Sequence, residues 1–83
     1  LNKKELDGLR NRFNSLTERE QEVLRHVVNG LPNKQIAGHL GLVEQTIKVH
    51  RSRVMAKMRT DSLAQLVLVA ERLGLAEANH TPI

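Results

Sequence analysis

Cysteine is absent from the sequence, and Phe13 is its one aromatic residue. Without cysteine no disulfide can form, which fits a reducing compartment. With a single aromatic side chain, the chain also lacks the stacking surfaces that proteins place under splayed bases of RNA or single-stranded DNA. If a nucleic acid is the partner, an intact duplex is therefore the better candidate.

Long apolar runs are missing as well. No stretch approaches the ~20 residues that a membrane-spanning helix needs, and no basic start followed by an apolar run suggests a secretory leader. We therefore expect a cytoplasmic protein, associated with the nucleoid if it binds DNA, that makes no contact with a membrane. No alternating β-rich run is present either, so the predicted fold class is all-α.

The periodicity of apolar residues, together with caps and helix breakers, predicts five helices in one small domain with a single core. The first, over residues 2 to 14, is a linker helix interrupted by Gly8 and frayed at its start. The second begins at the capping-box pattern of residues 17 to 20 and ends before Gly30.

A third helix has Pro32 in its first turn and stops at Gly41. The fourth covers residues 44 to 58, and the fifth covers about 63 to 73 and is closed by Gly74. These elements indicate a four-helix helix-turn-helix domain over residues 15 to 75, preceded by the linker helix of residues 1 to 14 and followed by a flexible tail of residues 76 to 83.

Positive charge is concentrated in the middle of the chain. The formal net charge is +4, but residues 31 to 60 carry six basic residues and one acidic residue, a net charge of +5. A basic segment suggests a polyanionic partner, although a solvated helix face explains charge alone equally well.

The same segment has the spacing of a helix-turn-helix: a short helix, a turn of three to four residues containing Gly41, and a longer helix. Ala37 is small enough for two helices to cross closely, and Gly41 can take the positive φ of the turn. The space between the helices is expected to be filled by Ile36, Leu40, Leu42 and Ile47.

Counted at 100° per residue from Ile47, the inward arc of the fourth helix contains Arg51, Val54 and Met58. The opposite arc contains no acid and could enter the electronegative major groove; it comprises Gln45, Lys48, Val49, Ser52 and Ala56. Lys48 can donate to guanine, Val49 offers a methyl surface to thymine, and Ser52 can donate or accept. Phosphate contacts, which fix register without reading sequence, are expected from Lys34, Gln45, Thr46, Arg51, Arg53 and Lys57. For Lys48 or Arg53 alone an exposed face without a partner is an equally good interpretation, and it is the surrounding motif that favours DNA.

The remaining polar residues suggest no catalysis, metal or cofactor. His50 stands where this motif usually has an apolar residue, so we expect a buried or half-buried histidine bonded to backbone rather than a DNA ligand. The other histidines fall in different elements, which argues against a metal site: His26, His39 and His80. The acids at the start of the second helix are expected to stabilise it through the helix dipole, and not to form an acid-base pair: Glu18, Glu20 and Glu22. We therefore do not expect an enzyme.

The fifth helix has more apolar surface than one core face requires. Its expected inward set is Leu63, Leu66, Val67 and Ala70, which leaves Ala64 and Leu68 on another face. These two residues either pack against the linker helix through Leu9 or Phe13, or form a two-fold contact in a homodimer on DNA.

Several runs resemble one family of bacterial transcription regulators, the LuxR/FixJ/NarL family. They are LTEREQEVL at 16 to 24, GLPNKQIA at 30 to 37 and TIKVHR at 46 to 51, and the similarity extends over about residues 10 to 75. Residues 53 to 58 (RVMAKM) and 62 to 67 (SLAQLV) are most similar to the FixJ branch. Val43 and Pro32 depart from it, because many members carry Ser or Thr at these positions, and Val43 cannot cap the following helix.

The resemblance implies that the fourth helix is the recognition helix and the last helix the dimer element. It also implies a receiver domain ahead of this module that a sensor kinase phosphorylates, and the chain, which begins with Leu1, is expected to be a fragment without that receiver. RNA polymerase is a further candidate partner. Two other interpretations remain: region four of a sigma factor, which needs core polymerase to bind a promoter element, and a helical protein-interaction module, which would show no salt-dependent affinity for DNA.

Overall fold

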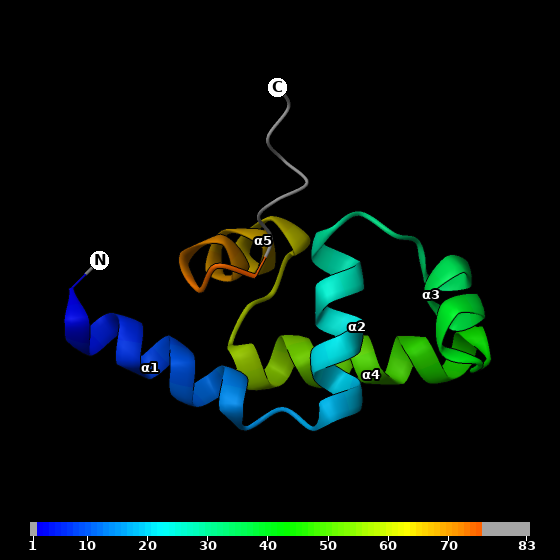
Figure 1. The fold of residues 1–83 in the computed structure, drawn as a ribbon, viewed down its shortest axis with the longest axis horizontal. Coiled ribbons are helices and arrows are strands. Elements are labelled where there is room, and N and C mark those ends of the chain that lie inside the picture. The colour runs from blue at the N-terminus through cyan, green and yellow to red at the C-terminus, as the bar shows by residue number, and fades with distance from the viewer. Residues whose placement is uncertain (1, 76–83) are drawn as a thin grey trace.

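The computed structural model describes residues 2 to 75, and over this range the chain forms helices and no strands. The five helices are α1 (Lys3–Asn14), α2 (Glu18–Val28), α3 (Asn33–Leu40), α4 (Glu44–Met58) and α5 (Leu63–Arg72) (Figure 1). The predicted all-α class is confirmed, with the linker helix and the four helices of the helix-turn-helix domain in the expected order. The predicted tail of residues 76 to 83 lies outside the described residues.

Three of the helices begin at a side-chain cap. Thr17 and Glu20 form the predicted capping box of α2, and the Ser62 side chain accepts from the Gln65 N–H at the start of α5. α1 begins with a second capping box, formed by Asn2 and Glu5. The expectation that α1 frays at its start and is interrupted at Gly8 was therefore wrong: the cap fixes the first turn, and the helix continues through Gly8.

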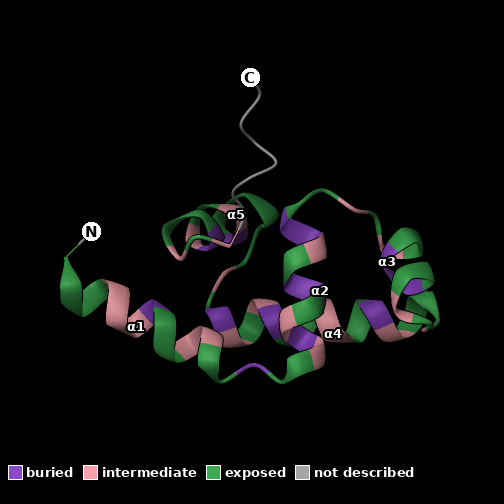
Figure 2. Cartoon of the chain, in the orientation of Figure 1, coloured by how far each residue is buried: buried purple, intermediate pink, exposed green. Residues whose placement is uncertain are grey.

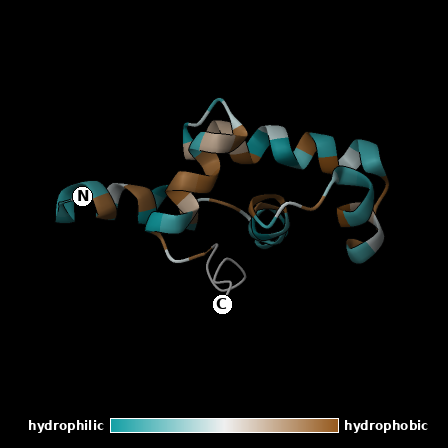
Figure 3. Ribbon diagram, turned by 90° about the horizontal axis from the view of Figure 1, so that it is seen from above, coloured by the Kyte–Doolittle hydropathy of each residue, from teal (hydrophilic) through white to brown (hydrophobic). Residues whose placement is uncertain are grey.

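The core lies where α2 crosses α4 at a steep angle, as two perpendicular views show (Figures 1 and 3). Buried residues are concentrated at this crossing and on the inner sides of α3 and α5 (Figure 2). The largest fully buried side chains are Leu24, Ile36, Ile47, Met58, Leu66, Val23 and Val54. Because each of α2, α3, α4 and α5 contributes to this cluster, the core fixes the orientation of α4 relative to the other helices.

α1 is packed onto this core. Leu9 is buried, Phe13 packs against the core cluster, and the Arg25 guanidinium carbon lies 5.6 Å from the centre of the Phe13 ring. α1 also contacts α4. The division between a linker helix and the following domain at residue 14 remains a prediction.

One expectation for α5 was wrong. Leu66 and Ala70 are buried and Val67 is partly buried, but the first residue of the helix, Leu63, is 46% exposed. A helical wheel gives the direction of a side chain around the axis and not how far the neighbouring helices extend along it, so it placed Leu63 inward. None of the helices over the described range is both long and apolar enough to cross a membrane.

Candidate nucleic-acid interface

Helices α3 and α4 form a helix-turn-helix with a turn over residues 41 to 43. Gly41 adopts the left-handed conformation (φ 68°, ψ 33°), and the Leu42 N–H donates to the Ala37 carbonyl at 2.9 Å, which closes the end of α3. Ile36 and Ile47 are fully buried between the helices, and Ala37 is buried as well. Leu40 and Leu42 pack against the core at its edge. The structure thus confirms the packing role predicted for these residues.

The inner side of α4 holds the helix to the rest of the domain. Ile47, Val54 and Met58 are buried, as the helical wheel predicted. Arg51 is half-buried, and its Nη1 donates to the Asn33 Oδ1 at 3.0 Å, which ties α4 to the first residue of α3. Arg51 therefore helps to orient the two helices. The sequence predicted only a phosphate contact for this residue and not this role.

Lys57 also has a partner inside the domain. Its Nζ lies 2.7 Å from Oε1 of Glu20, whose side chain is only 3% exposed, whereas that of Lys57 is 37% exposed. The same carboxylate oxygen accepts from the Thr17 N–H at 2.9 Å in the capping box. Glu20 therefore takes part in the cap of α2 and anchors the last turn of α4 at the same time. The predicted place of Glu20 in the capping box is confirmed, but its partner 37 residues along the chain was not predicted.

Electrostatics keep this buried carboxylate ionised. Burial by itself would raise the pKa of Glu20, but the hydrogen bond from Lys57, the bond from the Thr17 N–H, and the positive charges of Lys57 and His50 outweigh that effect. The pKa of Glu20 is therefore lowered below its ordinary value. The domain gains stability from this ion pair only while the carboxyl is charged.

The outer face of α4 is exposed and free of acids. All three predicted base-contacting residues lie there, with Lys48 and Ser52 exposed and Val49 40% exposed. Gln45 and Ala56 are exposed on the same helix. The one acid of α4 is Glu44, at its first residue. The sequence thus predicted this face correctly, and the packing of the opposite side confirms which way it points.

Two further residues predicted to contact phosphate, Thr46 and Arg53, lie on α4 beside this face, and Lys34 lies in the first turn of α3. Arg53 and Lys34 are exposed, and Thr46 is half-buried. Among the described residues, no side chain forms a hydrogen bond or ion pair with the charged end of Lys34, Lys48 or Arg53. These cations can therefore bind an external anion without breaking an existing contact.

Val43 stands at the N-cap of α4, is 67% exposed, and provides no side-chain acceptor. The Thr46 N–H donates to the Val43 carbonyl at 3.0 Å instead. The N–H groups of Glu44 and Gln45 have no acceptor within the described part of the chain. The predicted lack of a cap is therefore confirmed, and two amides at the turn point outward from the helix start.

The histidines differ in part from expectation. His50 is half-buried as predicted, but its Nδ1 is a buried atom with no hydrogen-bond partner, so the expected backbone bond is absent at that nitrogen. His26 and His39 lie on different helices, as predicted, but their rings stack with centres 5.5 Å apart and planes 12° from parallel, a contact that was not predicted. No third candidate ligand joins them in the described residues to complete a metal site. Their proximity depends on how α2 packs against α3, which the spacing of histidines in the sequence does not reveal.

On α5, the residues predicted to form a dimer contact are exposed. Ala64 is exposed and Leu68 is 46% exposed, so neither is packed away under α1. The two residues lie one turn apart on α5 and form an exposed apolar strip, so the alternative that this strip packs against Leu9 or Phe13 is not what the structure shows.

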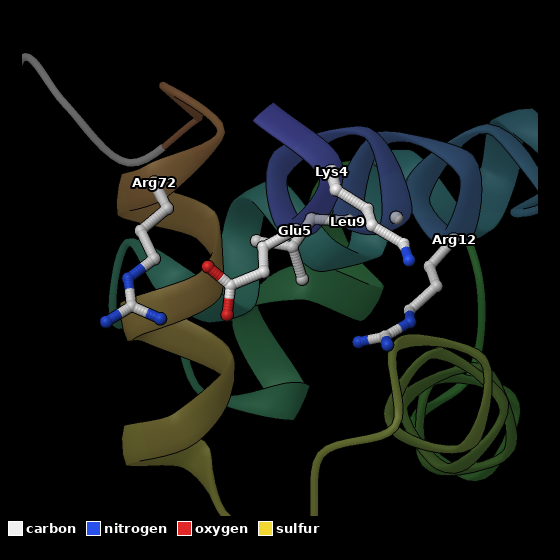
Figure 4. Close-up of a pocket in the computed structure, with 6 residues that line it drawn as sticks. Lys4, Glu5, Leu9, Arg12 and Arg72 are labelled. Carbon is white, nitrogen blue, oxygen red and sulfur yellow. The ribbon is translucent and has the colours of Figure 1, made fainter. Parts of the chain in front are cut away.

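A separate hollow of about 410 Å³ lies between α1 and α5, with Arg72 on α5 and the other lining residues on α1 (Figure 4). These lining residues are Lys4, Glu5, Gly8, Leu9 and Arg12. None of them belongs to the helix-turn-helix, so the candidate interface is the exposed face of α4 and its flanks, and not this hollow.

Known proteins are similar to most of this chain. It is 50% identical over 74 residues to Nodulation protein W from Bradyrhizobium diazoefficiens, a match that covers 89% of this chain and 32% of the relative. It is 50% identical over 64 residues to Transcriptional regulatory protein FixJ from Rhizobium meliloti, covering 77% of this chain and 31% of the relative. The chain thus spans about a third of the length of the relatives that it matches.

The fold is similar to that of solved response regulators. The structure of Response Regulator StyR superposes with a TM-score of 0.81 at 51% identity, covering 83% of this chain and 35% of that one. Full-length FixJ from B. japonicum superposes with a TM-score of 0.79 at 38% identity, covering 87% and 36% of the two chains. Residues 14 to 70 match the family model for bacterial regulatory proteins of the luxR family. With more than half of its length matched to a family of regulators, the chain belongs to the luxR family of bacterial regulatory proteins.

Proposed function

We propose that this chain is the DNA-binding output module of a bacterial response regulator, and that it binds duplex DNA with α4 in the major groove. One observation carries the proposal: α4 is locked into the core along one side, while its opposite side is exposed, polar and free of carboxylates. An α-helix of this kind fits the major groove of B-DNA, whose floor and walls are electronegative.

Three residues on the exposed face are suited to read bases. Lys48 can donate to the O6 and N7 of guanine, Val49 can pack against the methyl group of thymine, and Ser52 can donate or accept. They lie within two consecutive turns of α4, so their side chains would meet neighbouring base pairs. Sequence preference in this proposal therefore comes from Lys48, Val49 and Ser52.

Phosphate contacts would come from the residues around this set: Lys34, Gln45, Thr46, Arg51, Arg53 and Lys57. Lys34 and Arg53 are the strongest candidates, because both are exposed and make no ion pair within the described residues. Arg51 and Lys57 already bind Asn33 and Glu20, but each retains further N–H donors with which it can reach a phosphate. A phosphate oxygen is also a suitable acceptor for the two uncapped amides at the start of α4.

A second copy of the chain would complete the regulator on DNA. Ala64 and Leu68 present an exposed apolar strip that a two-fold partner could cover. Two such domains would contact half-sites about one helical turn apart.

In the whole protein, a receiver domain phosphorylated by a sensor kinase would control this module. StyR, to which this chain is similar over 83% of its length, is a response regulator, which supports this part of the proposal. The regulator would then work at the nucleoid in the cytoplasm, where RNA polymerase is a further partner.

The test is the salt dependence of binding to duplex DNA. Each phosphate contact should contribute about 0.9 to the slope of log affinity against log salt concentration, so several contacts per domain should give a steep fall. A flat response would support a helical protein-interaction module instead. A requirement for core polymerase before any promoter DNA is bound would support region four of a sigma factor.

A further inference from the structure

Four helices of the domain end in the same hydrogen-bonded turn, and in one of them the left-handed residue is not glycine. In each, one residue adopts the left-handed conformation, and the next residue donates its N–H to the carbonyl five positions before it. At the end of α4 this is the bond of 3.0 Å from the Thr60 N–H to the Met55 carbonyl. At α2, α3 and α5 the left-handed position is filled by Gly30 (φ 90°), Gly41 (φ 68°) and Gly74 (φ 77°). At α4 it is filled by Arg59 (φ 56°, ψ 47°), the one non-glycine residue with positive φ in the described part of the chain.

The backbone at this position favours glycine. A residue with a Cβ atom is less stable in the left-handed region, because the Cβ crowds the following carbonyl oxygen. Since the other three turns use glycine for the same shape, the turn itself gives no reason for an arginine. An unfavourable backbone conformation that persists in a structure points to a function of the residue that adopts it.

The Arg59 side chain does not stabilise the fold by a specific contact. The residue is exposed, and its guanidinium forms no hydrogen bond or ion pair with any described residue. Arg51 and Lys57, on the same helix, are by contrast bound to Asn33 and Glu20. The remaining structural explanation is a favourable interaction of the positive charge with the carboxyl end of the helix dipole.

The position of Arg59 along the helix axis relates it to the face proposed to read DNA. Arg59 is the C-cap, the first residue after α4, and follows Lys48 by eleven positions. At 1.5 Å per residue it lies about 16 Å further along α4. Because the major groove is only ~12 Å wide, a side chain this far from the base-reading residue would reach the edge of the groove, where the phosphates are.

We propose that Arg59 binds a backbone phosphate of DNA at the carboxyl end of α4, and that this contact is why an arginine occupies a position suited to glycine. The inference rests on the proposed function. The guanidinium suits the role, since its N–H donors can bind two phosphate oxygens at once. Arg59 would thus fix the far end of the recognition helix, while Lys34 contacts the backbone beside its start.

The experiment compares Arg59→Gly and Arg59→Lys with the parent domain in thermal unfolding and in binding to a duplex at several salt concentrations. Lys4→Gln on α1 is the control, since it also removes one exposed positive charge. For Arg59→Gly we expect an unchanged or higher midpoint of unfolding, an affinity about three- to tenfold weaker at low salt, and a salt slope smaller by about one. Arg59→Lys should keep the slope of the parent, and Lys4→Gln should bind as the parent does.

Two results would overturn the inference and leave the proposed function intact. One is an Arg59→Gly variant that binds with the affinity and slope of the parent. The other is an Arg59→Gly variant whose midpoint of thermal unfolding falls below that of Lys4→Gln while its salt slope equals that of the parent. This result would mean that Arg59 only stabilises α4 through the helix dipole. If the parent domain itself shows no salt-dependent binding to duplex DNA, the proposed function fails, and this inference fails with it.

Discussion

The ion pair between Glu20 and Lys57 should be a main support of the recognition helix, and Lys57→Met tests this. The substitution keeps the length and apolar part of the side chain but leaves the Glu20 carboxylate, 3% exposed, without its cation at 2.7 Å. Removing one partner of a fully buried pair costs roughly 3 to 5 kcal/mol. Because 37% of the Lys57 side chain is exposed, solvent screens the pair, and we expect a loss of about 2 kcal/mol.

For a domain of this size such a loss lowers the midpoint of thermal unfolding by roughly 8 to 16 °C, which helical circular dichroism can follow. Lys48→Met is the matched control, because it removes an exposed lysine from the same helix, and its effect should stay within about 0.5 kcal/mol. A loss in Lys57→Met no larger than in the control would refute the reasoning.

The pH dependence provides a second check on the same pair. The pKa of Glu20 is lowered in the folded state, so its contribution to stability is present above the ordinary glutamate value of 4.5 and is lost as the pH falls through the lowered pKa. The penalty in Lys57→Met also exists only while Glu20 is ionised. The difference in free energy of unfolding between parent and variant should therefore be largest near neutral pH and shrink in the acid range; a constant difference would argue against the assigned cause.

Four further substitutions test local features of the fold and the assembly. Val43→Ser should raise the free energy of unfolding by about 1 kcal/mol, because Val43 is largely exposed at an extended N-cap and serine would supply the missing acceptor; an unchanged urea midpoint would contradict this. Gly41→Ala should lower it by about 1 to 2 kcal/mol through backbone strain alone, since an added Cβ meets no atom within 4 Å. Gly38→Ala, inside α3 and equally unobstructed, should instead stabilise by about 0.5 to 1 kcal/mol, and equal signs for the two alanine variants would refute the assignment to φ. Leu68→Glu should leave thermal unfolding unchanged but abolish cooperative binding to paired half-sites in a gel-shift titration, whereas cooperative binding as in the parent would exclude the strip as the dimer contact.

The sequence predicted those features that depend on neighbours along the chain. The bounds of α4, the turn at Gly41 and the cap at Thr17 follow from periodicity and from single residues with a strong local preference, and the structure reproduces them. The exposed set of Lys48, Val49 and Ser52 follows from the helical period once Ile47 is known to be buried.

Features that depend on packing between distant segments were missed. The bond from Lys57 to Glu20 and the stacking of His26 on His39 need the crossing of α2 with its neighbours, which no local pattern encodes. Leu63 was predicted to face the core and is exposed, because periodicity does not say where a neighbouring helix ends. The capping box of Asn2 and Glu5 could have been found from spacing alone, since Asn is as good an N-cap as Thr.

The central claim is that the exposed face of α4 reads base pairs, while residues on the flank of this face contact the phosphates of the DNA backbone. The direct test measures the affinity of Lys48→Ala and Arg53→Ala for a duplex selected by the parent domain and for a scrambled duplex, each at two salt concentrations. If the account is correct, Lys48→Ala loses about 1 to 3 kcal/mol on the selected duplex and much less on the scrambled one. Arg53→Ala should lose similar amounts on both, with a salt slope smaller by about one. Equal losses on the two duplexes for Lys48→Ala would contradict the assignment of this face to base reading.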